Sequence, residues 1–179
     1  RLDGVTGVQT CALPISKSSG LDPQKMPMNR TNALLWDKWR RDQVTRIADY
    51  ISKKARKTVP SIEISATIVP SIEKAYFSTF QNWAEWLDKN IVDSVIVMNY
   101  TDDMDLVKLY TSSLASDKVQ MGLGAYIMKD NNSSVKTQLD YLKENSPGGV
   151  VIFSYDDIMN NEEIKNYLEK NFRTRRKPF

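Results

Sequence analysis

The sequence predicts an α/β protein built on parallel strands, and two observations carry the prediction. Short apolar runs alternate with helical segments four times, at a spacing of roughly thirty residues, as repeated strand–helix units do. Most of these runs are apolar on both faces, which is typical of strands buried between helices and a packed interior. Such units join through right-handed crossovers into one parallel sheet.

The clearest of these runs lies in residues 93–103. Its apolar part ends in Asn99 and Tyr100, and Asp102 and Asp103 follow shortly after. In parallel α/β folds, chemistry gathers at the carboxyl ends of the strands, because the loops there converge on one side. We therefore expect these four side chains to lie where a ligand can be bound.

Composition excludes several functional classes. The chain is 41% hydrophobic and 26% charged, with no apolar run long enough to cross a membrane. It has no histidine, which excludes His-based triads and His-ligated metals within this chain. The net charge is only +3, and much of the excess lies in a basic tail, residues 173–179. That tail is either a basic arm that binds an anionic partner or a solvated terminus. We expect no cofactor, no metal and no nucleic-acid partner.

The first fifteen residues look foreign to the protein. Residues 5–15 resemble the translation of a common sequencing-adapter oligonucleotide along their whole length, in one frame. A signal segment is the alternative, but the stretch lacks a basic start and a long apolar region. We expect residues 1–15 to be non-native, so that Cys11 carries no information on redox compartment or metal binding. We also expect the natural chain to extend upstream of Ser16.

The first elements after this point are a loop, a helix and a strand. Residues 16–35 are rich in Ser, Pro, Asn and Met and predict a long loop. A helix is expected from Trp36 to Val59, where Pro60 ends it. A strand follows over residues 61–69, with Ser65, Thr67 and Glu63 alternating against apolar residues. The helix is predicted to bury one apolar stripe: Val44, Ile47, Ala48, Ile51 and Ala55.

The remaining elements repeat the strand–helix unit. A single helix is predicted to run to Asn90. Strands are expected over residues 94–100, 119–126 and 150–155, with a helix after each. The predicted buried faces of the four helices are Phe77, Phe80, Trp83, Ala84 and Leu87; Leu106, Val107, Tyr110 and Leu114; Val135, Leu139 and Leu142; and Ile164, Tyr167 and Leu168.

Four such units fit either a small doubly wound sheet or part of a (β/α)₈ barrel. A doubly wound sheet usually carries a Gly-rich phosphate turn after its first strand, and none is present. Gly122 and Gly124 lie inside the third strand instead. With a chain extended upstream, four units fit the second half of a barrel over residues 36–172. Both edges of such a half should be unpaired, so we expect aggregation or pairing with a second copy.

A series of motifs resembles the bacterial glycosyl-hydrolase-like family ten, a group of glycosidase-like proteins. The resemblance covers about Gly20 to Tyr155. Its motifs are Trp36-x-x-Trp39-Arg40-Arg41, Ser65-Ala66, Gln81-Asn82-Trp83-x-x-Trp86, Met98-Asn99-Tyr100-Thr101 and Gly122-x-Gly124-Ala-Tyr126.

The resemblance implies a partial (β/α)₈ TIM barrel that acts on carbohydrate by general acid/base hydrolysis of a glycosidic bond. Within that family this segment corresponds to strands five to eight. The main catalytic carboxylate is then expected upstream of Ser16, together with the missing amino-terminal half-barrel, and this piece alone should be inactive. The family suggests a secreted or cell-envelope protein. The alternative is a non-catalytic carbohydrate-binding or cell-envelope protein on the same barrel.

Site residues follow from the strand ends. Amides and phenols at a barrel mouth hydrogen-bond to sugar hydroxyls, and aromatic rings stack on sugar faces. Glycoside hydrolysis needs paired carboxyl groups, for which Asp102 and Asp103 are weak candidates, since Asp is also common as a helix N-cap. The residues predicted to bind substrate are Asn99, Tyr100, Tyr126, Ser154 and Tyr155.

Overall fold

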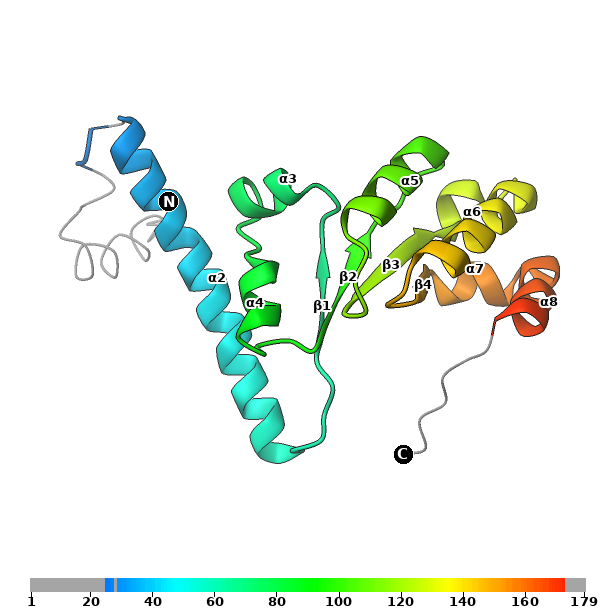
Figure 1. The fold of residues 1–179 in the computed structure, drawn as a ribbon, viewed down its shortest axis with the longest axis horizontal. Coiled ribbons are helices and arrows are strands. Elements are labelled where there is room, and N and C mark those ends of the chain that lie inside the picture. The colour runs from blue at the N-terminus through cyan, green and yellow to red at the C-terminus, as the bar shows by residue number, and fades with distance from the viewer. Residues whose placement is uncertain (1–24, 28, 173–179) are drawn as a thin grey trace, which may run out of the picture.

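The computed structural model describes residues 25–27 and 29–172, which form one layer of strands covered by helices (Figure 1). The predictions for residues 1–15, for half of the 16–35 loop and for the basic tail lie outside the described residues.

Four parallel strands form a single sheet. They are β1 (Ser65–Ile68), β2 (Ser94–Met98), β3 (Val119–Gly124) and β4 (Val150–Phe153), hydrogen-bonded in that order. Thr67 lies beside Ile96, Met98 beside Gly122, and Gly124 beside Phe153. Because each right-handed crossover moves to the next strand in the same direction, the helices are placed on one face. A doubly wound sheet would reverse its strand order. The predicted partial barrel of four parallel βα units is confirmed.

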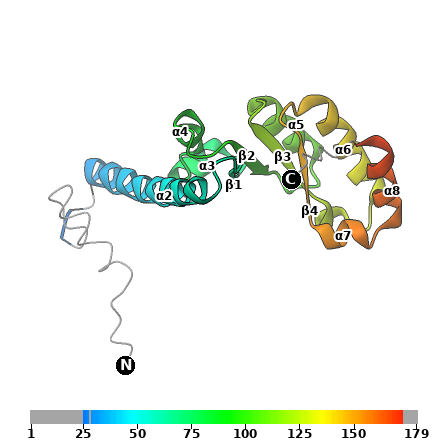
Figure 2. The same cartoon turned by 90° about the horizontal axis from the view of Figure 1, so that it is seen from below.

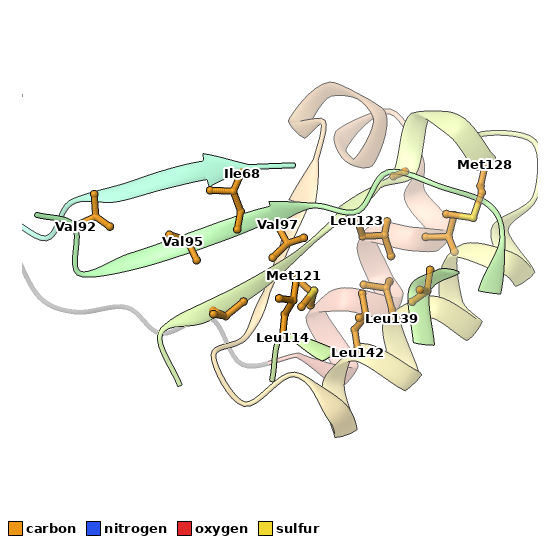
Figure 3. Close-up of a cluster of buried hydrophobic side chains, with 14 of the residues drawn as sticks. Ile68, Val92, Val95, Val97, Leu114, Met121, Leu123, Met128, Leu139 and Leu142 are labelled. Carbon is orange, nitrogen blue, oxygen red and sulfur yellow. The ribbon is translucent and has the colours of Figure 1, made fainter. Parts of the chain in front are cut away.

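The helix-covered face of the sheet is the core. Side chains at alternate strand positions point toward α6 (Asn132–Asn145) and its neighbours (Figure 3). Ile68, Val95, Val97, Met121 and Leu123 are each at most 1% exposed. They pack against helix residues that are also buried: Val107, Leu114, Val135, Leu139, Leu142 and Ile164.

The opposite face of the sheet is open. Ser65 and Thr67 on β1 are exposed, and Ile96 and Met98 on β2 are only partly buried. Phe153, which ends β4, is 51% exposed. This is the face that lines the interior in a closed barrel, so the sequence alternation predicted for β1 holds.

The helices after β2, β3 and β4 lie where the sequence predicts them (Figure 2). They are α5 (Met104–Ser113), α6, and α8 (Glu162–Asn171). Their predicted buried faces are confirmed except at Leu106, which is 38% exposed because it lies on the solvent side of its helix. Two short elements precede the last two: η1 (Ala125–Met128) and α7 (Tyr155–Met159). Asn131 and Asn161 cap α6 and α8, each accepting a backbone N–H at the third helical position.

The first helix departs from the prediction at its start and on its packed face. α2 (Arg30–Thr58) begins six residues before Trp36, because Asn29 caps it by accepting the Asn32 N–H, so the predicted loop is wrong over residues 30–35. Ile47 and Ile51 are 61% and 58% exposed rather than buried. The face that packs instead carries Arg41 and Ser52, together with Val44 and Ala48.

Polar contacts explain which side of α2 packs. Near the carboxyl end of the helix, Arg56 donates to both carboxylate oxygens of Asp93 at 2.9 Å and to the Asn90 carbonyl. Asp93 also accepts the Ile64 N–H at 2.7 Å. Partial burial by itself raises the pKa of Asp93, but the Ile64 N–H and the Arg56 guanidinium outweigh it and hold that pKa below its ordinary value. The apolar stripe in the sequence therefore does not predict the contact between Arg56 and Asp93 that fixes which side of α2 packs.

The helix predicted up to Asn90 is two helices, α3 (Ile72–Phe77) and α4 (Trp83–Asp88). Phe80, between them, has a φ of 56°, which no helix accommodates. Trp86 is the most buried aromatic residue here, at 4% exposed, and its indole N–H donates to Thr45 of α2 at 2.9 Å. Phe77 is 48% exposed and Ala84 is exposed as well, so the predicted buried face is wrong at both positions.

Candidate functional site

Three aromatic rings meet at the carboxyl ends of β2, β3 and β4. Tyr100 follows β2, Tyr126 lies in η1 directly after β3, and Phe153 ends β4. The rings of Tyr100 and Phe153 stack, with centroids 5.6 Å apart and planes 13° from parallel. Tyr126 stands edge-on to both, at 6.1 Å and 5.9 Å. We call Tyr100, Tyr126 and Phe153 the aromatic cluster.

Two glycines of β3 make room for this cluster. A Cβ on Gly124 would lie 2.9 Å from the Tyr100 Cβ and 3.2 Å from the Tyr126 ring. A Cβ on Gly122 would lie 2.6 Å from the Val97 carbonyl oxygen and 3.1 Å from the Tyr100 ring. The contacts with the Tyr100 Cβ and with the Val97 carbonyl oxygen are shorter than real Cβ atoms make, so either substitution would force neighbouring atoms to shift. The glycines therefore let Tyr100 lie across β3, with its ring against that of Phe153.

The cluster combines exposed ring surface with a neutral phenol. Phe153 is 51% exposed and Tyr126 is 42% exposed. Burial raises the pKa of Tyr100, and the neighbouring Tyr126 raises it further. The Tyr100 hydroxyl thus stays protonated well above neutral pH and can donate a hydrogen bond.

Polar side chains follow β4 beside the cluster. Ser154 is the N-cap residue directly before α7, and its hydroxyl donates to the carboxylate of Asp157. Tyr155 is 73% exposed. Asp157 also lines a hollow of about 510 Å³ between the η1–α6 segment and the α7–α8 segment, with Lys129, Asp130, Asn132, Asn161, Glu162 and Glu163 among its other lining residues.

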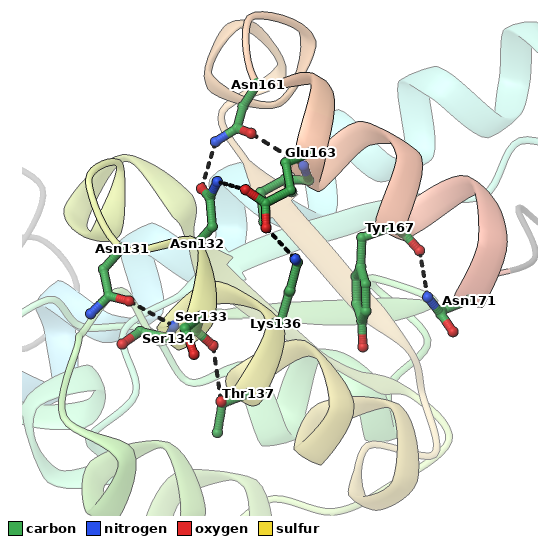
Figure 4. A network of polar contacts seen from close by, with 11 residues as sticks. Asn131, Asn132, Ser133, Ser134, Lys136, Thr137, Asn161, Glu163, Tyr167 and Asn171 are labelled. Carbon is green, nitrogen blue, oxygen red and sulfur yellow. Dashed lines mark hydrogen bonds and ion pairs between the residues drawn. The ribbon is translucent and has the colours of Figure 1, made fainter.

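The walls of this hollow are held by a polar network (Figure 4). Asn161 donates to the Asn132 side chain at 2.7 Å, and Asn132 donates to Glu163 at 2.6 Å. Lys136 pairs with the same carboxylate, and these two partners lower the pKa of Glu163. Because these side chains satisfy one another, the network joins α6 to α8 and gives the hollow a fixed wall. No three Cys, Asp or Glu side chains gather as metal ligands within residues 25–27 and 29–172.

The structure separates the predicted site residues into two groups. Tyr100, Tyr126, Ser154 and Tyr155 all lie at or directly after the carboxyl ends of the strands, as the sequence predicts. Asn99 differs, because it is 4% exposed and its amide nitrogen has no partner among the described residues. A ligand would reach this nitrogen only after the surrounding side chains move.

The two candidate carboxylates also differ. Asp103 is the N-cap of α5 and accepts the N–H groups of Asp105 and Leu106 at 2.8 Å and 3.3 Å. Asp102 is exposed, and no hydrogen bond or ion pair involves it within the described part of the chain. Of the two, Asp102 is the one whose carboxylate is not used by the fold.

Trp36 and Trp39 stack on each other near the start of α2. Their rings stack at 5.2 Å and 7° from parallel, and the Arg40 guanidinium lies 5.5 Å from the Trp36 ring and 4.1 Å from the Phe80 ring. Arg40 also pairs with Asp37. Arg40 thus links Phe80, in the segment between α3 and α4, to the stacked tryptophans of α2.

Sequence reasoning missed Phe153 and singled out its neighbours instead. The sequence pattern predicts Phe153 to be the last residue of a buried apolar run, but in the structure it lies on the open face beside Gly124. The alternation of Val150 to Phe153 across the sheet was the signal that could have found it. Asp157 was likewise one of several acidic residues after a strand, and only the contact with Ser154 distinguishes it.

A parallel sheet whose strands follow chain order, with one face covered by helices and the other open, is typical of the (β/α)-barrel class. The family model of glycosyl hydrolase-like 10 matches residues 17–121, more than half of the chain. The chain belongs to this family. Comparisons with curated proteins and with solved structures gave no match.

Within residues 25–27 and 29–172 no helix has both the length and the apolar character to cross a bilayer.

Proposed function

We propose that the chain is the carbohydrate-binding half of a glycosidase-like barrel and that the aromatic cluster contacts the sugar. The observation that supports this is the convergence of Tyr100, Tyr126 and Phe153 at the carboxyl ends of three adjacent strands. Sugars present apolar C–H faces and polar rims, and exposed rings with hydroxyls nearby match both. Family membership supports a glycosidic substrate.

Each residue has a separate part in this proposal. The exposed faces of Phe153 and Tyr126 stack on a sugar ring, and the Tyr100 hydroxyl donates to a ring substituent. Ser154 and Tyr155, next along the chain, supply polar contacts at the rim. Asn99 does not touch the sugar in this arrangement, because its side chain is buried.

Hydrolysis requires two carboxyl groups about 5 to 9.5 Å apart around the bond. We propose that the main catalytic carboxylate lies in a preceding part of the barrel, and that Asp102 is the residue of this chain best placed to assist it. Asp103 and Asp157 are engaged by a helix N-terminus and by Ser154. These engagements favour the second candidate function, a carbohydrate-binding protein that has kept the barrel without the chemistry.

Binding is tested with the full chain and a panel of neutral oligosaccharides, by calorimetry. Replacing Tyr126 by Ala removes one stacking surface and should weaken binding by about 0.5–1.5 kcal/mol, or about 2- to 12-fold. Tyr50→Ala is the matched control, since this tyrosine is 62% exposed on α2, away from the cluster. Equal losses in the two variants, or saccharide binding unchanged by Tyr126→Ala, would contradict the proposed site.

Catalysis is tested separately, with aryl glycosides as substrates. The chain alone should release no aglycone above background. Suppose instead that the chain hydrolyses these substrates, with activity lost in Asp102→Asn and kept in Asp103→Asn. That result would place a working carboxylate in this chain and refute the proposal that the main catalytic carboxylate lies in a preceding part of the barrel.

A further inference from the structure

The hollow between the η1–α6 and α7–α8 segments is the neighbour of the aromatic cluster. Ala125, which lines the hollow, directly precedes Tyr126 of the cluster. On the other wall, Asp157 accepts the hydroxyl of Ser154, and Ser154 directly follows Phe153. Both walls belong to consecutive strand–helix units of this chain, so the hollow does not depend on what lies beyond either edge of the sheet.

Several polar side chains that line the hollow are not used by the fold. Within the described residues, no hydrogen bond or ion pair involves the side chains of Lys129, Asp130 or Asn160. The Lys129 ammonium donates, the Asp130 carboxylate accepts, and the Asn160 amide does both. The Asp157 carboxylate has further acceptor positions, because within the same residues it accepts only the Ser154 hydroxyl. The hollow therefore offers donors and acceptors together, as the hydroxyl groups of a sugar require.

The hollow also has the size and rigidity of a binding site. Its volume of about 510 Å³ falls within the roughly 300–1,000 Å³ of ligand pockets. One wall is fixed in advance, since Asn161 donates to Asn132 and Asn132 donates to Glu163 (Figure 4). A ligand does not have to order this wall on binding, which lowers the cost of association.

Charge on the lining determines which ligands fit. The carboxylates that line the hollow outnumber the lysines by four to one: Asp130, Asp157, Glu162 and Glu163 against Lys129. Lys165 pairs with Glu162 and Lys136 pairs with Glu163, but Asp130 and Asp157 have no cationic partner within the described part of the chain. The remaining negative charge repels phosphate, sulfate and uronate groups. The hollow thus favours an uncharged ligand with many hydroxyls.

We propose that the hollow is a second sugar subsite, which binds the next unit of a neutral oligosaccharide whose first unit lies on the aromatic cluster. Lys129 and Asn160 donate hydrogen bonds to the sugar oxygens. Asp130 and Asp157 accept hydrogen bonds from its hydroxyls, and an ionised acceptor makes such bonds stronger than a neutral one does. The second subsite rests on the proposed carbohydrate function of the cluster, and it narrows the ligand to an uncharged chain of more than one sugar.

Ligand length tests the second subsite, by NMR titration of the full chain with glucose and N-acetylglucosamine as monosaccharides and as tetrasaccharides. Asp130→Ala removes one hydrogen bond to the second unit. It should weaken tetrasaccharide binding about 2- to 12-fold and leave monosaccharide binding unchanged. Asp117→Ala is the matched control, since it removes the same charge from an exposed aspartate just before β3, at the other end of that strand. It should change neither affinity.

Tyr126→Ala separates the failure of the second subsite from the failure of the cluster. This variant should weaken binding of both ligand lengths. If it does so while Asp130→Ala leaves tetrasaccharide binding unchanged, the second subsite is refuted and the cluster stands. An equal loss in Asp117→Ala also refutes the second subsite. If the unmodified chain binds none of these saccharides, both proposals are wrong.

Backbone amides of the unmodified chain give a readout that needs no variant. The Asp130 and Asn160 amides should shift with a neutral tetrasaccharide and stay in place with the monosaccharide. A galacturonic acid tetramer should shift neither, because the negative charge of the lining repels it. Amides that do not respond to the neutral tetrasaccharides, or that respond more strongly to the uronate, overturn the second subsite.

Discussion

Replacing Ile68 by Ala tests whether the sheet has one buried face and one open face. Ile68 is 0% exposed on the covered face of β1, whereas its neighbour Thr67 is exposed on the other face. The change removes three carbons, worth about 2.4 kcal/mol of transfer free energy at about 0.8 kcal/mol for each. The cavity left behind raises the expected loss to about 3–4 kcal/mol.

Thr67→Ala is the matched change on the adjacent residue. It keeps the Thr67 carbonyl that Gln81 binds, and it should lower the free energy of unfolding by no more than about 1 kcal/mol. Urea unfolding of both variants, followed by tryptophan fluorescence and circular dichroism at low protein concentration, measures the two losses. Losses of similar size would mean that the open face, which carries Thr67, is buried as deeply as the core. That result would refute a sheet with only one covered face.

Three further predictions concern single contacts. Gly122→Ala should lower the free energy of unfolding by about 1–3 kcal/mol, because its Cβ would meet the Val97 carbonyl at 2.6 Å, and a loss near zero by urea titration would show that β2 can shift. Asp93 has a lowered pKa in the folded state, so the stability it adds is complete above its ordinary value of 3.8 and is lost as the pH falls through the folded value. The acid part of the pH–stability curve should therefore flatten in Asp93→Asn, and an unchanged curve would contradict the role of Arg56. Trp86→Phe should cost about 1–2 kcal/mol through the lost bond to Thr45, an effect that should largely vanish in a Thr45→Val background, as a double-mutant cycle measures.

Sequence patterns were sufficient for the sheet and its later helices. Val135, Leu139 and Leu142 fall on one helical stripe, and all three are buried under β3 and β4, at most 2% exposed. The order of the units along the chain also predicts their order in the sheet. Local periodicity and chain order determine these features, so no long-range contact was needed to predict them.

Long-range polar contacts explain where the sequence prediction failed. Ile47 and Ile51 continue an apolar stripe on α2, yet the helix turns its Arg56 side toward Asp93, in a segment far along the chain. Likewise, the helix pattern of residues 72–90 is broken where Gln81 binds β1. Periodicity contains no information about either partner.

The sequence predicted where the candidate site lies, but not all of the residues that form it. The rule that ligands bind at the carboxyl ends of strands pointed to Tyr100 and Tyr126, which the structure brings together. It did not point to Phe153 or reveal that Asn99 is buried, whereas the preference of Asp for helix N-caps anticipated the role of Asp103. Those outcomes depend on the facing of single residues at strand ends, where the alternation of a short strand gives way to a loop.

The most direct test of carbohydrate binding at the aromatic cluster is an NMR titration of the full chain with the oligosaccharide panel. Ring protons of Tyr100, Tyr126 and Phe153 should shift together and saturate with one binding curve, while those of Tyr50 stay in place. Shifts that arise on α2 or in the hollow beside Glu163, with the three cluster rings unmoved, would show that the sugar binds elsewhere and that the cluster is only packing.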